Sequence, residues 1–203
     1  MIRYLLLFIF LPAITAQSFA FAPANGRKND TVNYRIDTLK SKIFWKCDVH
    51  HGYVLIKEGW LKTVGHSIVS GEITVKMDSI VDLDIDYALM KGTLENVLRS
   101  DVFFDVKNFP EAKFRVAHTE KLSDTSFQIT GDLNIRGIDN CIIFNTTTET
   151  GRDSLIIKSE EFTINRLNWG ITAYSAHVVN SDDSFVVSDG IDFTFVLVGY
   201  RVD

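Results

Sequence analysis

Apolar and polar residues alternate along most of this chain. Between Ser41 and Val49, the residues Ile43, Trp45 and Cys47 fall on one side and charged residues on the other, with Phe44 the exception. A period of two is typical of a half-buried β-strand. The same pattern predicts further strands over residues 53–62, 71–77, 112–117, 127–135, 141–148, 155–165 and 190–198, with a bulge near 160–161 and a hairpin turn over 137–140.

One segment departs from this alternation. Within an insertion of about residues 82–100, the apolar residues Leu94, Val97 and Leu98 are spaced by three and four, which predicts a short helix over 93–98. The loop that follows carries apolar residues where loops are usually polar. We expect this loop to turn its apolar side chains onto a shared interior, namely Val102, Phe103, Phe104, Val106 and Phe109.

About eight strands with polar outer faces, short turns and one helical insertion predict an all-β fold. An eight-stranded antiparallel, lipocalin-like barrel is the natural arrangement, because closure removes the unpaired edges of an open sheet. A barrel of this size is either filled by its own side chains or able to hold one small ligand. The periodicity leaves both interiors open.

The N-terminus has the layout of a secretory signal peptide. A basic residue, Arg3, precedes a short apolar run and a small-residue stretch that ends at Ala20. We therefore expect a signal peptide over 1–20, a flexible leader over 21–32 and one domain over 33–203, in a periplasmic or secreted protein. The sequence contains no second apolar segment, so we expect no transmembrane span after the signal peptide.

Charge and cysteine content narrow the function classes. Cleavage after Ala20 removes one basic residue and no acidic one, so the net charge changes from −5 to −6. A protein of this sign lacks the basic surface that nucleic acid requires. Cys47 and Cys141 are too few for a disulfide framework; either they form one bridge or both are small buried apolar side chains.

Motifs for metal binding and catalysis are not evident in the sequence. The histidines, at 50, 51, 66, 118 and 177, include no set with metal-ligand spacing. The run Asp82, Asp84, Asp86 suggests a calcium loop, but Ala88 and Leu89 stand where an oxygen ligand and a glycine are needed. There is also no Gly-x-Ser-x-Gly or phosphate-binding glycine loop. We expect no metal, no cofactor and no enzymatic activity.

Five stretches together resemble the YceI-like family of lipocalin-like, polyisoprenoid-binding proteins. They are Tyr34-x-Ile36-Asp37 with Ser41-x-Ile43-x-Trp45; Gly71-x-Ile73 with Met77-Asp78-Ser79-Ile80; Leu98-x-Ser100-Asp101-x-Phe103-Phe104-Asp105-Val106 with Phe109-Pro110-x-Ala112-x-Phe114; Gly131-Asp132-Leu133-x-Ile135-Arg136-Gly137; and Phe162-x-Ile164-Asn165-Arg166-x-x-Trp169-Gly170-Ile171. The resemblance implies a barrel around an apolar tunnel that takes a long isoprenoid or similar lipid, commonly in exported bacterial proteins, without catalysis. The chain departs from the family at Lys40, where a histidine is usual, and at its two cysteines.

On this basis we expect a non-catalytic protein that binds, transports or stores a lipid. The alternative is an envelope or stress-related scaffold with a filled barrel that contacts protein partners, and a homodimer is left open. For each expected wall residue, plain core packing is the competing interpretation. The expected tunnel wall consists of Trp45, Ile73, Val75, Met77, Phe103, Phe104, Phe114, Phe127, Ile129 and Phe195.

Arg166 and Trp169 form a separate candidate site. Arg166 either holds a polar head group at the mouth of the barrel, or its charge lies over an aromatic face or is tied to backbone carbonyls.

Overall fold

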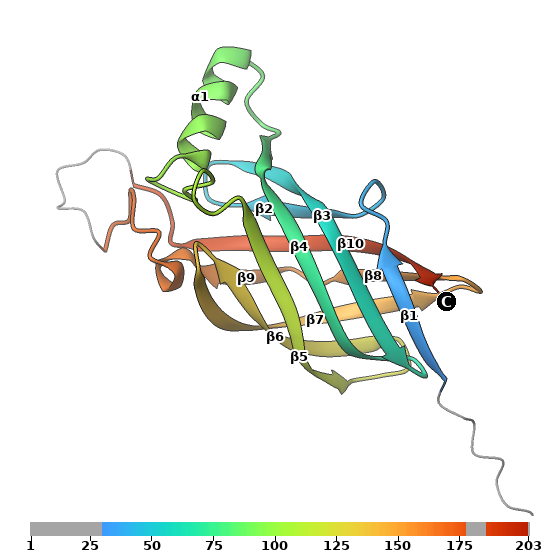
Figure 1. The fold of residues 1–203 in the computed structure, drawn as a ribbon. Helices are drawn as coiled ribbons and strands as arrows, with labels where there is room; N and C mark the ends of the chain where they lie inside the picture. The colour runs from blue at the N-terminus through green and yellow to red at the C-terminus, as the bar shows by residue number, and fades with distance from the viewer. Residues whose placement is uncertain (1–29, 178–185, 203) are drawn as a thin grey trace, which may run out of the picture.

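The computed structural model describes residues 30–177 and 186–202, so the expected signal peptide and residues 21–29 of the leader lie outside the described residues. The described chain folds into a β-barrel with one helix at one end (Figure 1). Its elements are β1 (Thr31–Ile36), β2 (Lys42–Lys46), β3 (His51–Val64), β4 (Ser67–Asp82), α1 (Ala88–Arg99), β5 (Glu111–Lys121), β6 (Ser126–Ile135), β7 (Ile138–Thr150), β8 (Ser154–Ser159), β9 (Phe162–Asn165), the 3-10 helix η1 (Arg166–Trp169) and β10 (Gly190–Val202).

The strands occupy eight positions around a closed antiparallel barrel. From β2 to β8 each strand pairs with the next one in the chain. β1 and β2 share one position between β3 and β10, and β8 and β9 share another beside β10. β10 closes the barrel by pairing with both of these positions. One edge of β10 pairs first with β2 and then with β1, while the other edge pairs with β9 and then with β8. The predicted eight-stranded antiparallel barrel is thereby confirmed.

Several strand boundaries differ from the sequence prediction. β1 was not predicted as a strand, and Thr31 and Val32, which we expected in the leader, belong to it because they pair with β3. The predicted bulge is confirmed: Val196 pairs with Lys158 but Phe193 pairs with Phe162, so one extra residue lies between β8 and β9.

The turn between β6 and β7 is shorter than the predicted 137–140: it begins one residue earlier and ends three residues earlier. It consists of Arg136 and Gly137, with φ of 53° and 76°, between the paired residues Ile135 and Ile138. Positive φ at both positions is the signature of the two-residue turn that matches strand twist. Alternation alone does not place a turn to within one residue.

α1 projects from one end of the barrel (Figure 1). It is longer than predicted, and its last turn is fastened to β4 by Arg99, whose guanidinium donates to the carbonyl oxygens of Asp78 (3.0 Å) and Ile80 (2.6 Å). Glu95 accepts a hydrogen bond from the backbone N–H of Asp82 at 3.1 Å. None of the helix residues is buried, so the helix is held mainly through its C-terminal half.

The loop after α1 folds onto the barrel as expected, apart from one residue. Phe103 is buried and Phe104 partly buried, whereas Val102 is exposed, because only one face of the loop meets the barrel. Arg136 in the β6–β7 turn donates to the carbonyl oxygen of Phe103 at 2.7 Å. This bond ties the loop to the same end of the barrel as α1.

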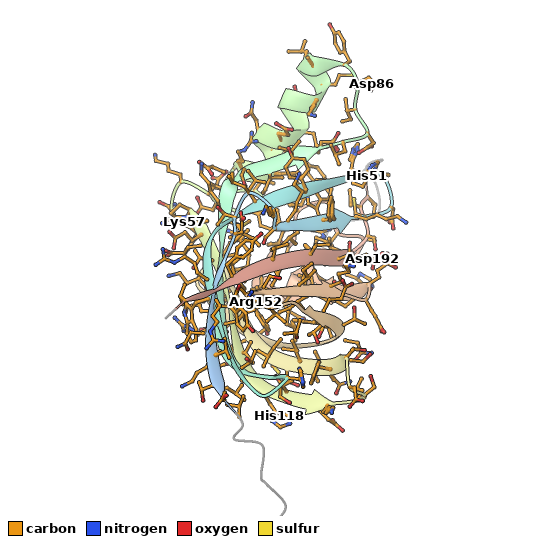
Figure 2. The ribbon with its side chains drawn as sticks, turned by 90° about the vertical axis from the view of Figure 1, so that its right-hand side faces the viewer. His51, Lys57, Asp86, His118, Arg152 and Asp192 are labelled. Carbon is orange, nitrogen blue, oxygen red and sulfur yellow. The ribbon has the colours of Figure 1, made fainter. Side chains whose placement is uncertain are left out.

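The two ends of the barrel differ. His51 and Asp86 lie at the α1 end, and His118 lies at the opposite end (Figure 2). Near the opposite end the inward side chains are fully buried, among them Leu61, Ile68 and Leu155. The interior is therefore sealed by apolar side chains at the end away from α1.

Gly131 marks a point where the barrel wall has no room for a side chain. A Cβ on Gly131 would lie 2.3 Å from the carbonyl oxygen of Arg115 and 2.3 Å from the ring of Phe114. We expect Gly131→Ala to lower the free energy of unfolding by about 1–3 kcal/mol, because the backbone must shift. Gly92→Ala in α1 is the matched control, since nothing lies within 4 Å of its Cβ and alanine favours helix. Urea unfolding of both variants checks this, and equal stabilities would contradict it.

Candidate functional site

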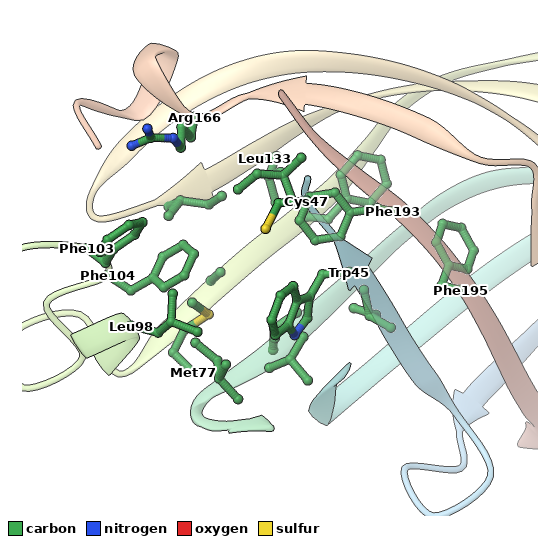
Figure 3. Close-up of a pocket in the computed structure, with 18 of the residues that line it drawn as sticks. Trp45, Cys47, Met77, Leu98, Phe103, Phe104, Leu133, Arg166, Phe193 and Phe195 are labelled. Carbon is green, nitrogen blue, oxygen red and sulfur yellow. The ribbon is translucent and has the colours of Figure 1, made fainter. Parts of the chain in front are cut away.

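The barrel encloses one large cavity of about 790 Å³ (Figure 3). Its wall is made by inward side chains of the strands, and its end is bordered by α1 and by the loops that contain Phe104 and Tyr174. Lining residues at this end, such as Val49 and Met90, are themselves exposed to solvent. The cavity therefore opens at the α1 end.

Most residues expected from the sequence to form the wall border this cavity. β2 and β4 contribute Trp45 and Met77, and Phe103 and Phe104 come from the loop after α1 (Figure 3). The structure brings together Trp45, Ile73, Val75, Met77, Phe103, Phe104, Phe114, Ile129 and Phe195, and also Arg166. Their position is thus established, and their contact with a ligand stays a prediction.

Phe127 and Trp169 do not border the cavity. Phe127 has the same strand phase as Ile129 but is fully buried, because the cavity ends before Phe127, the first inward residue of β6. Trp169 is 1% exposed and donates its indole N–H to the carbonyl oxygen of Leu133 at 3.0 Å. Its ring belongs to a buried apolar cluster and does not line the cavity, so the cavity does not support a ligand contact at this residue.

Several wall residues were missed from the sequence. Phe144 is the centre of an aromatic cluster, with ring centroids 4.8 Å from Phe162, 5.3 Å from Phe114 and 5.4 Å from Phe195. Phe193 lines the cavity beside them (Figure 3). The alternation of β10 already places Phe193 on the side of Phe195, so this residue could have been found from the sequence.

Polar groups in the wall are concentrated at the open end. They include Cys47, His50, Thr93, Arg166, Tyr174 and Ser188; the wall residue Trp45 in addition has a buried indole N–H without a hydrogen-bond partner among the described residues. Toward the sealed end the wall is apolar, with residues such as Leu61, Ile68 and Ile157. A ligand with one polar end and one apolar tail matches this distribution.

Arg166 is held by the protein's own backbone. Its guanidinium donates to four carbonyl oxygens, those of Ile171 (2.9 Å), Ala173 (2.6 Å), Val187 (3.2 Å) and Ser188 (3.1 Å). Nη2 also lies 3.1 Å from Asp189 Oδ1, and the group stands over the Phe103 ring at 5.7 Å. With its donors occupied in this way, Arg166 ties two loops together. Of the alternatives drawn from the sequence, a charge held by backbone carbonyls is therefore the one that describes Arg166.

Asp189 links Arg166 to a neighbouring loop. Its Oδ2 accepts a hydrogen bond from the Ser175 hydroxyl at 3.0 Å and lies 2.7 Å from His177 Nδ1. Burial acts to raise the pKa of the Asp189 carboxyl, but these hydrogen bonds and the charge of Arg166 outweigh it and lower the pKa below its usual value. Burial lowers the pKa of the Arg166 guanidinium, against the attraction of Asp189.

A second polar cluster lies beside the opening and consists of His50, Asp82 and Asp84. His50 Nδ1 is 2.9 Å from Asp84 Oδ2 and 3.7 Å from Asp82 Oδ2. Burial raises the pKa of the Asp82 carboxyl. Burial also acts to raise the pKa of Asp84, but hydrogen bonds from the His51 backbone N–H and from His50 outweigh it and lower the pKa to about 2. His50 is 34 positions from Asp84 in the sequence, which is why spacing did not reveal the cluster.

Both cysteines are free in this structure. Cys47 borders the cavity (Figure 3) and is partly buried, whereas Cys141 is exposed on β7. They are not bridged: Cys47 follows β2 and Cys141 lies in β7, and these two strands are not neighbours in the barrel. They are not both buried either, because Cys141 is exposed.

A closed antiparallel barrel around an apolar cavity that opens at one end defines the class of lipocalin-like binding barrels. Within this class, a model of the YceI-like domain matches residues 34–198. The chain therefore belongs to the YceI-like family. No curated protein sequence matches it.

Solved structures with the same fold are distant in sequence. Burkholderia cenocepacia BcnA is 17% identical with a TM-score of 0.59, over 80% of this chain and 98% of that chain. A polyisoprenoid binding domain from Saccharophagus degradans, implicated in plant cell wall breakdown, is 14% identical with a TM-score of 0.57, over 83% and 98%. The Campylobacter jejuni YCEI protein is 18% identical with a TM-score of 0.52, over 78% and 84%. At these identities the comparison establishes the fold.

In the ranges 30–177 and 186–202, we find no helix with the length and apolar character needed to cross a bilayer.

Removal of the Arg166 side chain tests its structural role. We expect Arg166→Ala to lower the free energy of unfolding by about 3–5 kcal/mol, because four carbonyls and a buried carboxylate lose their partner. Urea unfolding measures this. The control is Arg152→Ala in the exposed turn after β7, where a change within about 0.5 kcal/mol is expected. A loss for Arg166→Ala no larger than that of the control would contradict the structural role.

The lowered pKa of Asp189 predicts a pH-dependent contribution to stability. A carboxyl whose pKa is lower in the folded than in the unfolded state stabilises the fold above its unfolded pKa, about 3.9, and this contribution is lost as the pH falls through the folded value. The stability advantage of the wild type over Asp189→Asn should therefore shrink as the pH falls below about 4. Urea unfolding of both proteins across this range provides the measurement, and a constant difference would contradict it.

Proposed function

We propose that this protein binds a long-chain isoprenoid or a similar lipid in its cavity and does not catalyse a reaction. The observation that carries the proposal is the large apolar cavity, open at the α1 end and sealed at the other. Its volume of about 790 Å³ falls within the range of roughly 300–1,000 Å³ typical of small-molecule sites.

The composition of the wall accounts for affinity without a polar binding site. Each CH₂ group removed from water contributes about 0.8 kcal/mol, so a chain of several isoprene units gains its affinity from hydrocarbon burial alone. Hydrogen-bonding groups are then needed only where a head group leaves the barrel.

The distribution of polar residues indicates an orientation for the ligand. The tail extends toward Leu61 and Ile68 at the sealed end, and the head group lies near Cys47 and Tyr174 at the opening. Arg166 borders this region but already donates to backbone carbonyls, so we do not assign the head group to it.

The comparisons support the same function. The Saccharophagus degradans relative is described as a polyisoprenoid binding domain, and it shares the fold over 83% of this chain. With the N-terminal pattern of a signal peptide, this favours transport or storage of a lipid in the periplasm or outside the cell. The alternative of a scaffold with a filled barrel is not favoured, because a filled interior would leave no cavity of this size.

A matched pair of substitutions on β7 tests the proposal. Ile142 borders the cavity, whereas the next residue, Ile143, is exposed on the outer face. We expect Ile142→Trp to reduce the lipid retained by the protein at least about tenfold, because the indole fills the space that the chain occupies. Ile143→Trp should retain lipid at the wild-type level.

The measurement is native mass spectrometry, with lipid extraction, of the three proteins purified from the original host. Thermal unfolding confirms that both variants are folded. A bare polypeptide mass for the wild type under gentle conditions, or equal lipid retention in both variants, would refute lipid binding in the cavity.

A further inference from the structure

The ends of two paired strands bring a histidine and two carboxylates together beside the opening. In the antiparallel β3–β4 hairpin Gly52 pairs with Asp82. His50, two residues before Gly52, therefore stands opposite Asp84, two residues after Asp82. The backbone N–H of Leu83 donates to the carbonyl oxygen of His51 at 2.9 Å, which continues this register past the strand ends. Asp82 is the last residue of β4 and lies beside both.

The three side chains have the spacing of metal ligands. His50 Nδ1 lies 2.9 Å from Asp84 Oδ2 and 3.7 Å from Asp82 Oδ2, and the three atoms lie within 4.8 Å of one another. Nitrogen and oxygen ligands about 2.1 Å from a tetrahedral ion are separated by about 3.4 Å. Small side-chain movements would give that geometry: the 2.9 Å separation of His50 and Asp84 widens and the longer separations shorten.

One oxygen of the cluster has no hydrogen-bond partner among the described residues, and the nitrogen of His50 lies 3.7 Å from it. Asp82 is fully buried; its Oδ1 accepts hydrogen bonds from the backbone N–H groups of Asp84 (3.2 Å) and Ile85 (2.8 Å), but its Oδ2 accepts none. A buried carboxylate oxygen without a hydrogen bond costs free energy. This oxygen is directed at His50 and Asp84, where a bound cation would compensate its charge.

We propose that His50, Asp82 and Asp84 bind a divalent transition-metal ion of the zinc class. The ligands are His50 Nδ1 and the Oδ2 atoms of the two aspartates. The position of Asp84 is set by its other oxygen, which accepts a hydrogen bond from the His51 backbone N–H at 2.9 Å. Three protein ligands leave a coordination position for water or for another ligand.

The donor set distinguishes this ion from calcium and magnesium. Calcium takes six to eight oxygen ligands, and magnesium binds oxygen in an octahedron, whereas an imidazole with two carboxylates suits zinc-class ions. We therefore revise our expectation that the chain has no metal site. Because His50 also borders the cavity, the ion lies at its opening, but the site does not depend on the lipid.

Titration of the untagged, chelator-treated protein with Zn²⁺ in a calorimeter tests the site. We expect one equivalent to bind with micromolar or tighter affinity and to raise the melting temperature. Asp82→Asn keeps an oxygen that can accept the two backbone hydrogen bonds and removes the buried charge, and it should weaken Zn²⁺ binding at least about 100-fold. His50→Gln, a second variant at a partly exposed position, should have the same effect.

Two substitutions serve as controls. Asp86→Asn alters an exposed carboxylate of the same loop, and His118→Ala removes an exposed histidine at the other end of the barrel (Figure 2). Both should bind Zn²⁺ like the wild type. The proposal is overturned if the wild type binds no Zn²⁺, if it binds Ca²⁺ in preference to Zn²⁺, or if folded Asp82→Asn and His50→Gln proteins bind Zn²⁺ as tightly as the wild type.

Discussion

The closure of the sheet by β10 is the constraint on which the rest of this structure depends. β10 pairs with β2 and β1 along one edge and with β9 and β8 along the other. These four short strands thereby fill two strand positions, one on each side of β10. Without this strand both edges of the sheet would be unpaired. Closure also converts the inward side chains of eight strand positions into the lining of a single cavity.

The segments outside the barrel are concentrated at its open end. α1, the loop with Phe103 and Phe104, and the segments tied by Arg166 all border the opening, and they are fastened by side chains that donate to backbone carbonyls. The opposite end is sealed by buried apolar residues. The wall is therefore apolar over most of its depth and polar only at the opening, which is the arrangement that a lipid with a polar head requires.

Two charged clusters at this opening have different chemical character. Asp189 Oδ1 and Asp82 Oδ2 are both buried without a hydrogen bond among the described residues. Asp189 Oδ1 lies 3.1 Å from the guanidinium of Arg166, whose positive charge compensates it, so this pair holds the loops in place. The nitrogen beside Asp82 Oδ2 is instead that of the His50 imidazole, at 3.7 Å. The contrast separates a structural ion pair from a group of ligands, although both consist of ordinary charged side chains.

The amino-acid sequence by itself determined most of the strands, though not β1, as well as the helical insertion and the inward face of most strands, because alternation and helical spacing are local properties of the chain. It therefore identified wall residues such as Ile73, Val75 and Phe195. It did not determine whether Phe127 reaches the cavity, which groups surround Arg166, or that His50 stands opposite Asp84. These depend on strand register and on whether the inward side chains fill the barrel, and only the tertiary structure decided them, since they arise from residues that are distant in sequence.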